Sequence, residues 1–228
     1  MTLHGKLDGD VSDREAWALR RRRGISNNKQ LFVLTCMDER IPVEEALGLE
    51  LGDAHIFRNA GAVVTDDVIR SAALTTHFFG TKEIVILLHT ECGMLTADGE
   101  DIAALWDKHL AEHHQTTLED VSLDPGSPDL QVPRDKIGAW VRTFTDVDEA
   151  AIEQESLLRD HPLIPDDVPV HAYIYEVESG RVRRPRAVLG KVVSEAPGAV
   201  IEQQPANPAL QAVGPDARHA EDRSFATD

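Results

Sequence analysis

The sequence predicts an α/β fold, because short apolar segments alternate with amphipathic ones through its first half. Three segments are predicted strands: Gln30–Thr35, Ala54–Arg58 and Glu83–His89. The first and third are nearly unbroken apolar runs, which is typical of parallel strands buried on both faces. The order strand, helix, strand, helix, strand favours a mostly parallel sheet with right-handed crossovers.

Helices are predicted between these strands and before them. An opening helix, Asp13–Arg23, ends in a run of arginines before Gly24, which suits the negative end of the helix dipole. A short helix, Pro42–Leu49, begins at a proline. A longer one runs from the cap at Thr65 or Asp66 to about Phe79.

The second half carries weaker signals. We expect a helix around Glu100–His114, more helix from Lys136 through Arg159, and an alternating strand over His171–Glu178. Ser179-Gly180 predicts a hairpin turn after that strand. We therefore divide the chain into an N-terminal helical arm (1–29), an α/β domain (30–193) that contains all the predicted strands, and a flexible or partner-contacting tail (194–228).

Composition narrows the possible functions. The 228 residues include 23 Lys plus Arg against 40 Asp plus Glu, a net charge of −17. Such a charge repels phosphate backbones and disfavours nucleic-acid binding. The apolar runs are too short to cross a bilayer, and MTLHGKLDGD lacks the features of a signal peptide. We therefore expect a cytoplasmic protein with no membrane partner.

The two cysteines could form one bridge, remain simple thiols, serve redox chemistry or bind a metal. Cys36 follows the first predicted strand, and Cys92 lies three residues after His89, which ends the third. Ligands gather at the carboxyl ends of parallel strands, and two thiolates with one imidazole leave the open fourth position of a catalytic zinc site. The placement favours one Zn²⁺ on Cys36, His89 and Cys92.

Asp38 and Arg40 follow Cys36 at intervals of two residues. A carboxylate there could be a fourth ligand or could accept a proton from zinc-bound water, whose pKa zinc lowers towards ~7. Arg40 would hold Asp38 ionised through paired hydrogen bonds. The alternative is a surface ion pair of little consequence.

These motifs resemble those of the β-class carbonic anhydrases. The resemblance rests on C-x-D-x-R at 36–40, H-x-x-C at 89–92 and RNAG at 58–61, and covers roughly Trp17–Leu95 and Leu157–Pro185. Flanking segments such as LTCMDER, DAHIFRNAG and HTECGML are most similar to the carbon disulfide hydrolase branch, which also resembles the carbonyl sulfide hydrolases. One departure is Ala62, which stands where a second glycine is expected after RNAG.

The resemblance implies a β-carbonic-anhydrase-like sheet of order 2-1-3-4 with a C-terminal antiparallel edge. It implies zinc on Cys36, His89 and Cys92, with Asp38 and Arg40 as the activating dyad. Zinc hydroxide would attack the central carbon of a small neutral substrate: carbon disulfide gives carbonyl sulfide, then carbon dioxide and hydrogen sulfide. It further implies a homodimer that assembles into higher homo-oligomers. Carbonic anhydrase activity, carbonyl sulfide hydrolysis and a non-catalytic binding or assembly module are the alternatives.

Two sets of residues are more weakly indicated. Six apolar residues could line a substrate pocket, although ordinary core packing explains most of them: Phe57, Val63, Val64, Phe78, Phe79 and Leu95. His109 and His113 lie four residues apart on a predicted helix and could bind a second metal, but a solvated helix face explains them more simply.

Overall fold

The computed structural model describes residues 14–122 and 134–186. The chain divides into two compact units, Met1–Glu195 and Ala196–Asp228, and all the described residues belong to the first. The predicted tail (194–228) and the first 13 residues of the predicted arm therefore lie outside the described residues. The domain boundaries stay a prediction.

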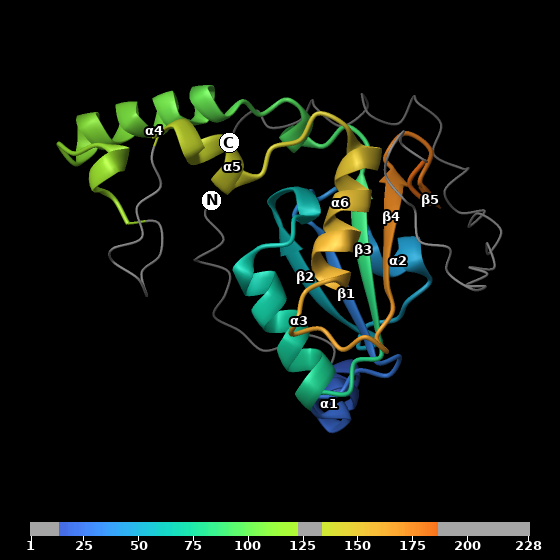
Figure 1. Cartoon of the computed structure of the whole chain (residues 1–228). Coiled ribbons are helices and arrows are strands. Elements are labelled where there is room, and N and C mark those ends of the chain that lie inside the picture. The colour runs from blue at the N-terminus through green and yellow to red at the C-terminus, as the bar shows by residue number, and fades with distance from the viewer. Residues whose placement is uncertain (1–13, 123–133, 187–228) are drawn as a thin grey trace, which may run out of the picture. The chain divides into compact units, whose positions relative to one another are not determined.

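A five-stranded sheet of order β2-β1-β3-β4-β5 forms the centre of the described unit (Figure 1). Its strands are β1 Leu31–Cys36, β2 Ala54–Asn59, β3 Glu83–His89, β4 Val170–Glu176 and β5 Arg181–Arg183. The first four are parallel, and β5 pairs antiparallel with β4. The predicted order and antiparallel edge are both confirmed. All six residues of β1 are buried, which agrees with the unbroken apolar run in its sequence.

Six α-helices are described: α1 Arg14–Arg23, α2 Val43–Leu47, α3 Asp66–Phe78, α4 Gly99–His113, α5 Ile137–Val141 and α6 Val147–Arg159. Figure 1 shows α3 and α6 over one face of the sheet and α2 over the other. Right-handed crossovers require this, because the chain moves outward from β1 to β2 and then back across the sheet to β3 and β4. None of these helices has the length and apolar character needed to span a bilayer.

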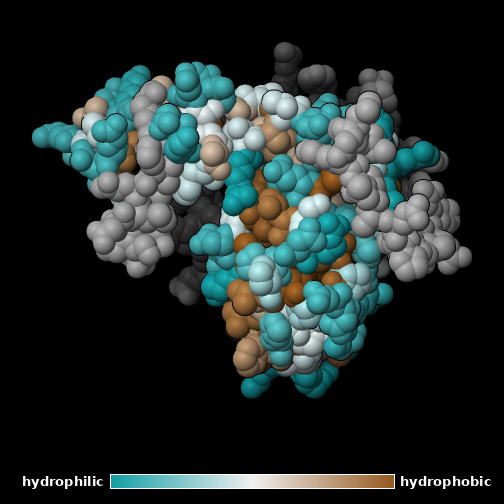
Figure 2. Space-filling model, in the orientation of Figure 1, coloured by the Kyte–Doolittle hydropathy of each residue, from teal (hydrophilic) through white to brown (hydrophobic). Residues whose placement is uncertain are grey.

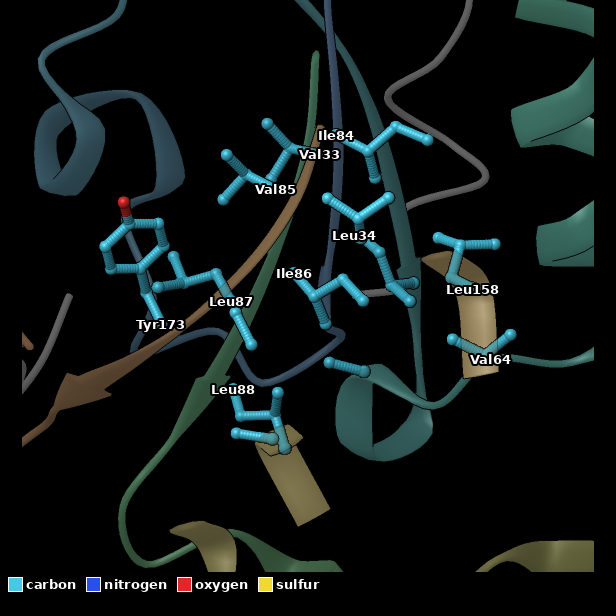
Figure 3. Close-up of a cluster of buried hydrophobic side chains, with 14 of the residues drawn as sticks. Val33, Leu34, Val64, Ile84, Val85, Ile86, Leu87, Leu88, Leu158 and Tyr173 are labelled. Atoms are coloured by element: carbon cyan, nitrogen blue, oxygen red, sulfur yellow. The ribbon is translucent and has the colours of Figure 1, made fainter. Parts of the chain in front are cut away.

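The main hydrophobic core lies between the sheet and its helices (Figure 3). Leu34 and Ile86 from the two central strands pack with Leu158 of α6, and all three side chains are fully buried. Burial of each such side chain is worth roughly 1.5–3 kcal/mol. This core fixes β1 and β3 side by side and so fixes the positions of the residues at their ends.

The helix predicted over Lys136–Arg159 is present as two helices, α5 and α6, with a break between them that was not predicted. α5 ends at Val141, and the next residue, Arg142, adopts a left-handed conformation (φ 61°). The Asp146 side chain then accepts a hydrogen bond from the Glu149 backbone N–H and begins α6. An aspartate in this capping position is a sequence signal for a new helix, and the sequence analysis missed it.

Candidate metal centre

The parallel sheet brings Cys36, His89 and Cys92 together. Cys36 is the last residue of β1 and His89 the last of β3, and these strands are direct neighbours. Cys92 follows β3 in the next turn. The potential ligand atoms of all three lie within 4.8 Å of one another, and all three residues are buried. The sequence placed these side chains at strand ends, and the topology makes them adjacent.

The donor atoms fit a soft or borderline metal ion. The His89 side chain is only 1% exposed, and neither ring nitrogen has a hydrogen-bond partner. Such a buried polar group is costly unless something binds it. The two sulfurs are 4.0 Å apart and are free thiols, so there is no bridge between them. The hydrogen bond between the two thiols lowers the pKa of Cys36 and raises that of Cys92, so the negative charge of the pair is favoured on Cys36.

The turn after β2 supports the Cys36 sulfur. The Gly61 backbone N–H donates to Cys36 Sγ at 3.3 Å. Gly61 has a φ of 83°, and a Cβ there would lie 2.9 Å from the Met94 side chain. Ala62, fully buried, is also left-handed at φ 57°. Its conformation gives the physical reason for expecting a glycine at this position, since the left-handed region disfavours residues with a Cβ.

Arg58 clamps the loop that follows β1. Its guanidinium donates to the backbone carbonyl oxygens of Cys36 (2.9 Å), Asp38 (3.1 Å) and Ile41 (2.9 Å). The sequence analysis used Arg58 only as part of the RNAG motif and did not identify this contact. The signal was its position: the end of β2 lies beside the end of β1, where unpaired carbonyl groups begin.

Asp38 and Arg40 form the predicted paired contact. Arg40 Nε donates to Asp38 Oδ1 at 3.0 Å, and Nη2 donates to Oδ2 at 2.9 Å. The guanidinium thereby holds the pKa of the Asp38 carboxyl well below its usual range. Asp38 Oδ2 also lies 3.8 Å from His89 Nε2. The carboxylate is thus ionised, oriented and adjacent to the buried cluster.

Glu91 is a further contact of this pair that the sequence analysis missed. Arg40 Nη2 donates to the Glu91 carbonyl oxygen at 3.0 Å, and Nη1 reaches Glu91 Oε2 at 3.2 Å. Glu91 itself is left-handed, with a φ of 52°. Beside it, the Thr90 hydroxyl donates to Glu178 and accepts from the Val177 N–H. The loop between His89 and Cys92 is therefore fixed from both sides.

The predicted pocket-lining residues separate into two groups. Val64, Phe57 and Leu95 belong to or pack against the main core, as the alternative interpretation of core packing expects. Phe78 is instead 77% exposed at the end of α3. Figure 2 shows hydrophobic surface over α3 and α6. Three further exposed side chains of these segments are apolar: Leu74 of α3, Leu157 of α6 and Leu163 in the loop after α6.

Comparison with known proteins decides the family. The carbonic anhydrase family model matches residues 31–182, which is more than half of the chain. This chain belongs to the β-class carbonic anhydrases. The matched region contains the whole sheet apart from one residue of β5, together with all three cluster residues.

The relatives to which this chain is similar include carbon disulfide hydrolases as well as carbonic anhydrases. A carbon disulfide hydrolase of Acidithiobacillus thiooxidans is 47% identical over 85% of this chain and 96% of its own length. The solved apo form of a carbon disulfide hydrolase is 44% identical, covers 80% of this chain and 93% of its own, and superimposes with a TM-score of 0.67. The carbonic anhydrase of Streptococcus mutans is 34% identical over 82% of this chain and 99% of its own, with a TM-score of 0.55.

Proposed function

We propose that this protein hydrolyses carbon disulfide with a zinc ion held by Cys36, His89 and Cys92. The observation that carries the proposal is the buried cluster beside the Arg40-bound Asp38, in a chain 47% identical to a carbon disulfide hydrolase over nearly that enzyme's full length. Carbon disulfide and water give carbonyl sulfide and hydrogen sulfide. Carbonyl sulfide and a second water then give carbon dioxide and hydrogen sulfide.

The protein's own residues prepare the attack of water on carbon. Bound zinc would supply Lewis acidity that lowers the pKa of water towards ~7. Asp38 Oδ2, the carboxylate oxygen nearer His89, is placed to take up the proton that water loses and, because Arg40 lowers the pKa of this carboxyl, to release it to solvent rather than retain it. It can do so while bonded to Arg40, because a carboxylate oxygen has two lone pairs. Arg40 keeps the carboxylate ionised, and Arg58 and Glu91 position the segments that carry the pair.

The experiment measures the release of hydrogen sulfide from carbon disulfide by zinc-loaded protein. We expect release of two molecules of hydrogen sulfide for each carbon disulfide consumed, measured with a sulfide electrode, and a zinc content of one ion per chain. Metal-depleted protein is the matched control and should release none. A zinc-loaded protein that releases no sulfide would overturn the proposal.

Carbonic anhydrase activity is the second candidate, supported by the family to which the chain belongs and by the 34% identity to the Streptococcus mutans enzyme. Stopped-flow measurement of carbon dioxide hydration on the same preparation tests it. Rapid hydration without sulfide release would favour this activity. We also propose the predicted homodimer and its higher assemblies, which light scattering on the purified full chain would test.

A further inference from the structure

A cluster of histidines lies at the carboxyl end of α4, on a segment that takes no part in the Cys36–His89–Cys92 centre. His109 and His113 are one helical turn apart, and His114 follows as the residue that caps the helix. The ring centroids of His109 and His113 are 4.8 Å apart, and those of His109 and His114 are 5.7 Å apart. All three side chains are exposed, so a dissolved ion can reach them.

The spacing of the two nearer rings fits chelation of one metal ion. Each zinc–nitrogen bond is about 2.05 Å, so a ring centre lies about 3.2 Å from a bound ion, and two rings at roughly 100° are then about 4.9 Å apart. The observed 4.8 Å agrees with that separation. The two rings are therefore close enough for one ion to bind a nitrogen from each.

Electrostatics at this end of the helix also favour a cation. The last carbonyl groups of α4 give its carboxyl end a partial negative charge. Lys108 is the one lysine of that turn, and its Nζ lies 4.0 Å from Glu112 Oε1. The glutamate charge therefore offsets the positive charge of the lysine. Figure 2 shows the α4 region as mostly hydrophilic, so little apolar surface would have to be rearranged.

We infer that His109 and His113 form a second, surface metal site for a borderline divalent ion such as Zn²⁺, Ni²⁺ or Cu²⁺. Imidazole nitrogen is the preferred donor for these ions, and water would complete the coordination of this open site. The site has two imidazoles and no thiolate, so it binds more weakly than the buried centre and fills after it. The sequence analysis identified the pair but preferred a solvated helix face.

The test is calorimetric titration of Ni²⁺ into tag-free, full-length protein whose buried centre is already loaded with zinc. We expect one Ni²⁺ to bind per chain, and binding at least tenfold weaker in His109→Ala/His113→Ala. His161→Ala, which removes a histidine from another part of the molecule, is the matched control and should bind as the native protein does. Sulfide release and carbon dioxide hydration should be unchanged in the double variant, because these residues are separate from the proposed active site.

Two outcomes would overturn the inference: no Ni²⁺ binding by the native protein, or equal binding by the double variant. The milder His113→Gln variant guards against a folding defect, since glutamine keeps the length and polarity of the helix surface. It should lose binding as the double variant does, while its circular dichroism and zinc content stay native.

Discussion

The sheet and the α4–α5 segment are built in different ways. The ends of β1 and β3 rest on a continuous core in which Leu34 and Ile86 are fully buried. The α4–α5 segment has its own small cluster of Ala103, Leu118 and Ile137, and its side chains include an exposed leucine, Leu105. A large core fixes side chains to within fractions of an ångström, whereas a small one leaves its segment marginally stable. The difference explains why the buried candidate centre of Cys36, His89 and Cys92 lies at the sheet, whereas the histidine pair proposed on α4 is exposed.

The largest expected effect comes from removing a ligand at the sheet. Cys92→Ser replaces a soft thiolate with a hydroxyl, so zinc should be lost and activity should fall to that of metal-free protein. Metal analysis and sulfide release measure both. Met37→Leu, which changes an exposed side chain beside Cys36, should retain both. Zinc retention by the Cys92 variant would contradict the proposed ligand set.

The next largest effect is expected for Asp38, whose replacement should lower activity without loss of zinc. Asp38→Asn keeps the shape of the side chain but removes the proton acceptor, so activity should fall about 10²–10⁴-fold with zinc content unchanged. Glu39→Gln, at the adjacent exposed position, is the matched control and should change activity little. If Asp38→Asn lost zinc instead, the residue would be a ligand rather than a base.

Charges inside the sheet region should make its stability depend on pH. Burial raises the pKa of Asp148, but hydrogen bonds from Arg183 (2.6 and 3.1 Å) and from the Arg186 N–H outweigh this and lower it. A lowered folded pKa stabilises the protein above the unfolded value of about 3.9, and this contribution disappears as pH falls below it.

Asp148→Asn loses the hydrogen bonds that its carboxylate accepts from Arg183, so the free energy of unfolding at pH 7 should fall by about 1.5–3 kcal/mol. Its stability should also fall less than that of the native protein between about pH 5 and 2. Urea denaturation across this range measures both effects. Asp160→Asn is the control, because its ion pair with Arg159 is exposed and solvent screening leaves such a pair little effect on stability.

The most local expected effect concerns the α4–α5 segment alone. A Cβ on Gly99 would lie 2.5 Å from the Gly138 Cα, whereas a Cβ on Gly138 would lie 3.4 Å from the Gly99 Cα. Gly99→Ala should force the two helices apart at a cost of about 1–3 kcal/mol, and Gly138→Ala should cost less. Hydrogen exchange should show faster exchange in α4 and α5 but not in β1 and β3. An equal increase of the exchange rate in β1 and β3 would contradict the view that the two regions are stabilised separately.

Much of the sheet could be predicted, because its signals are local. The unbroken run EIVILLH predicted β3 with its observed bounds, Glu83–His89, since a strand buried on both faces needs apolar residues throughout. Ser179-Gly180 predicted the hairpin between β4 and β5. The break between α5 and α6 was missed, because Arg142 has no intrinsic preference for the left-handed conformation that ends α5.

For the site, the sequence by itself determined the donor types, their positions at strand ends and the pairing of Asp38 with Arg40, because these depend on spacing and composition. Only the tertiary structure decided that the three donors converge, since that requires β1 and β3 to be neighbours. It also decided that Arg58 and Glu91 hold the surrounding loops. Hydrogen bonds between residues more than 20 positions apart leave no local pattern, and so they become visible only when the chain is folded.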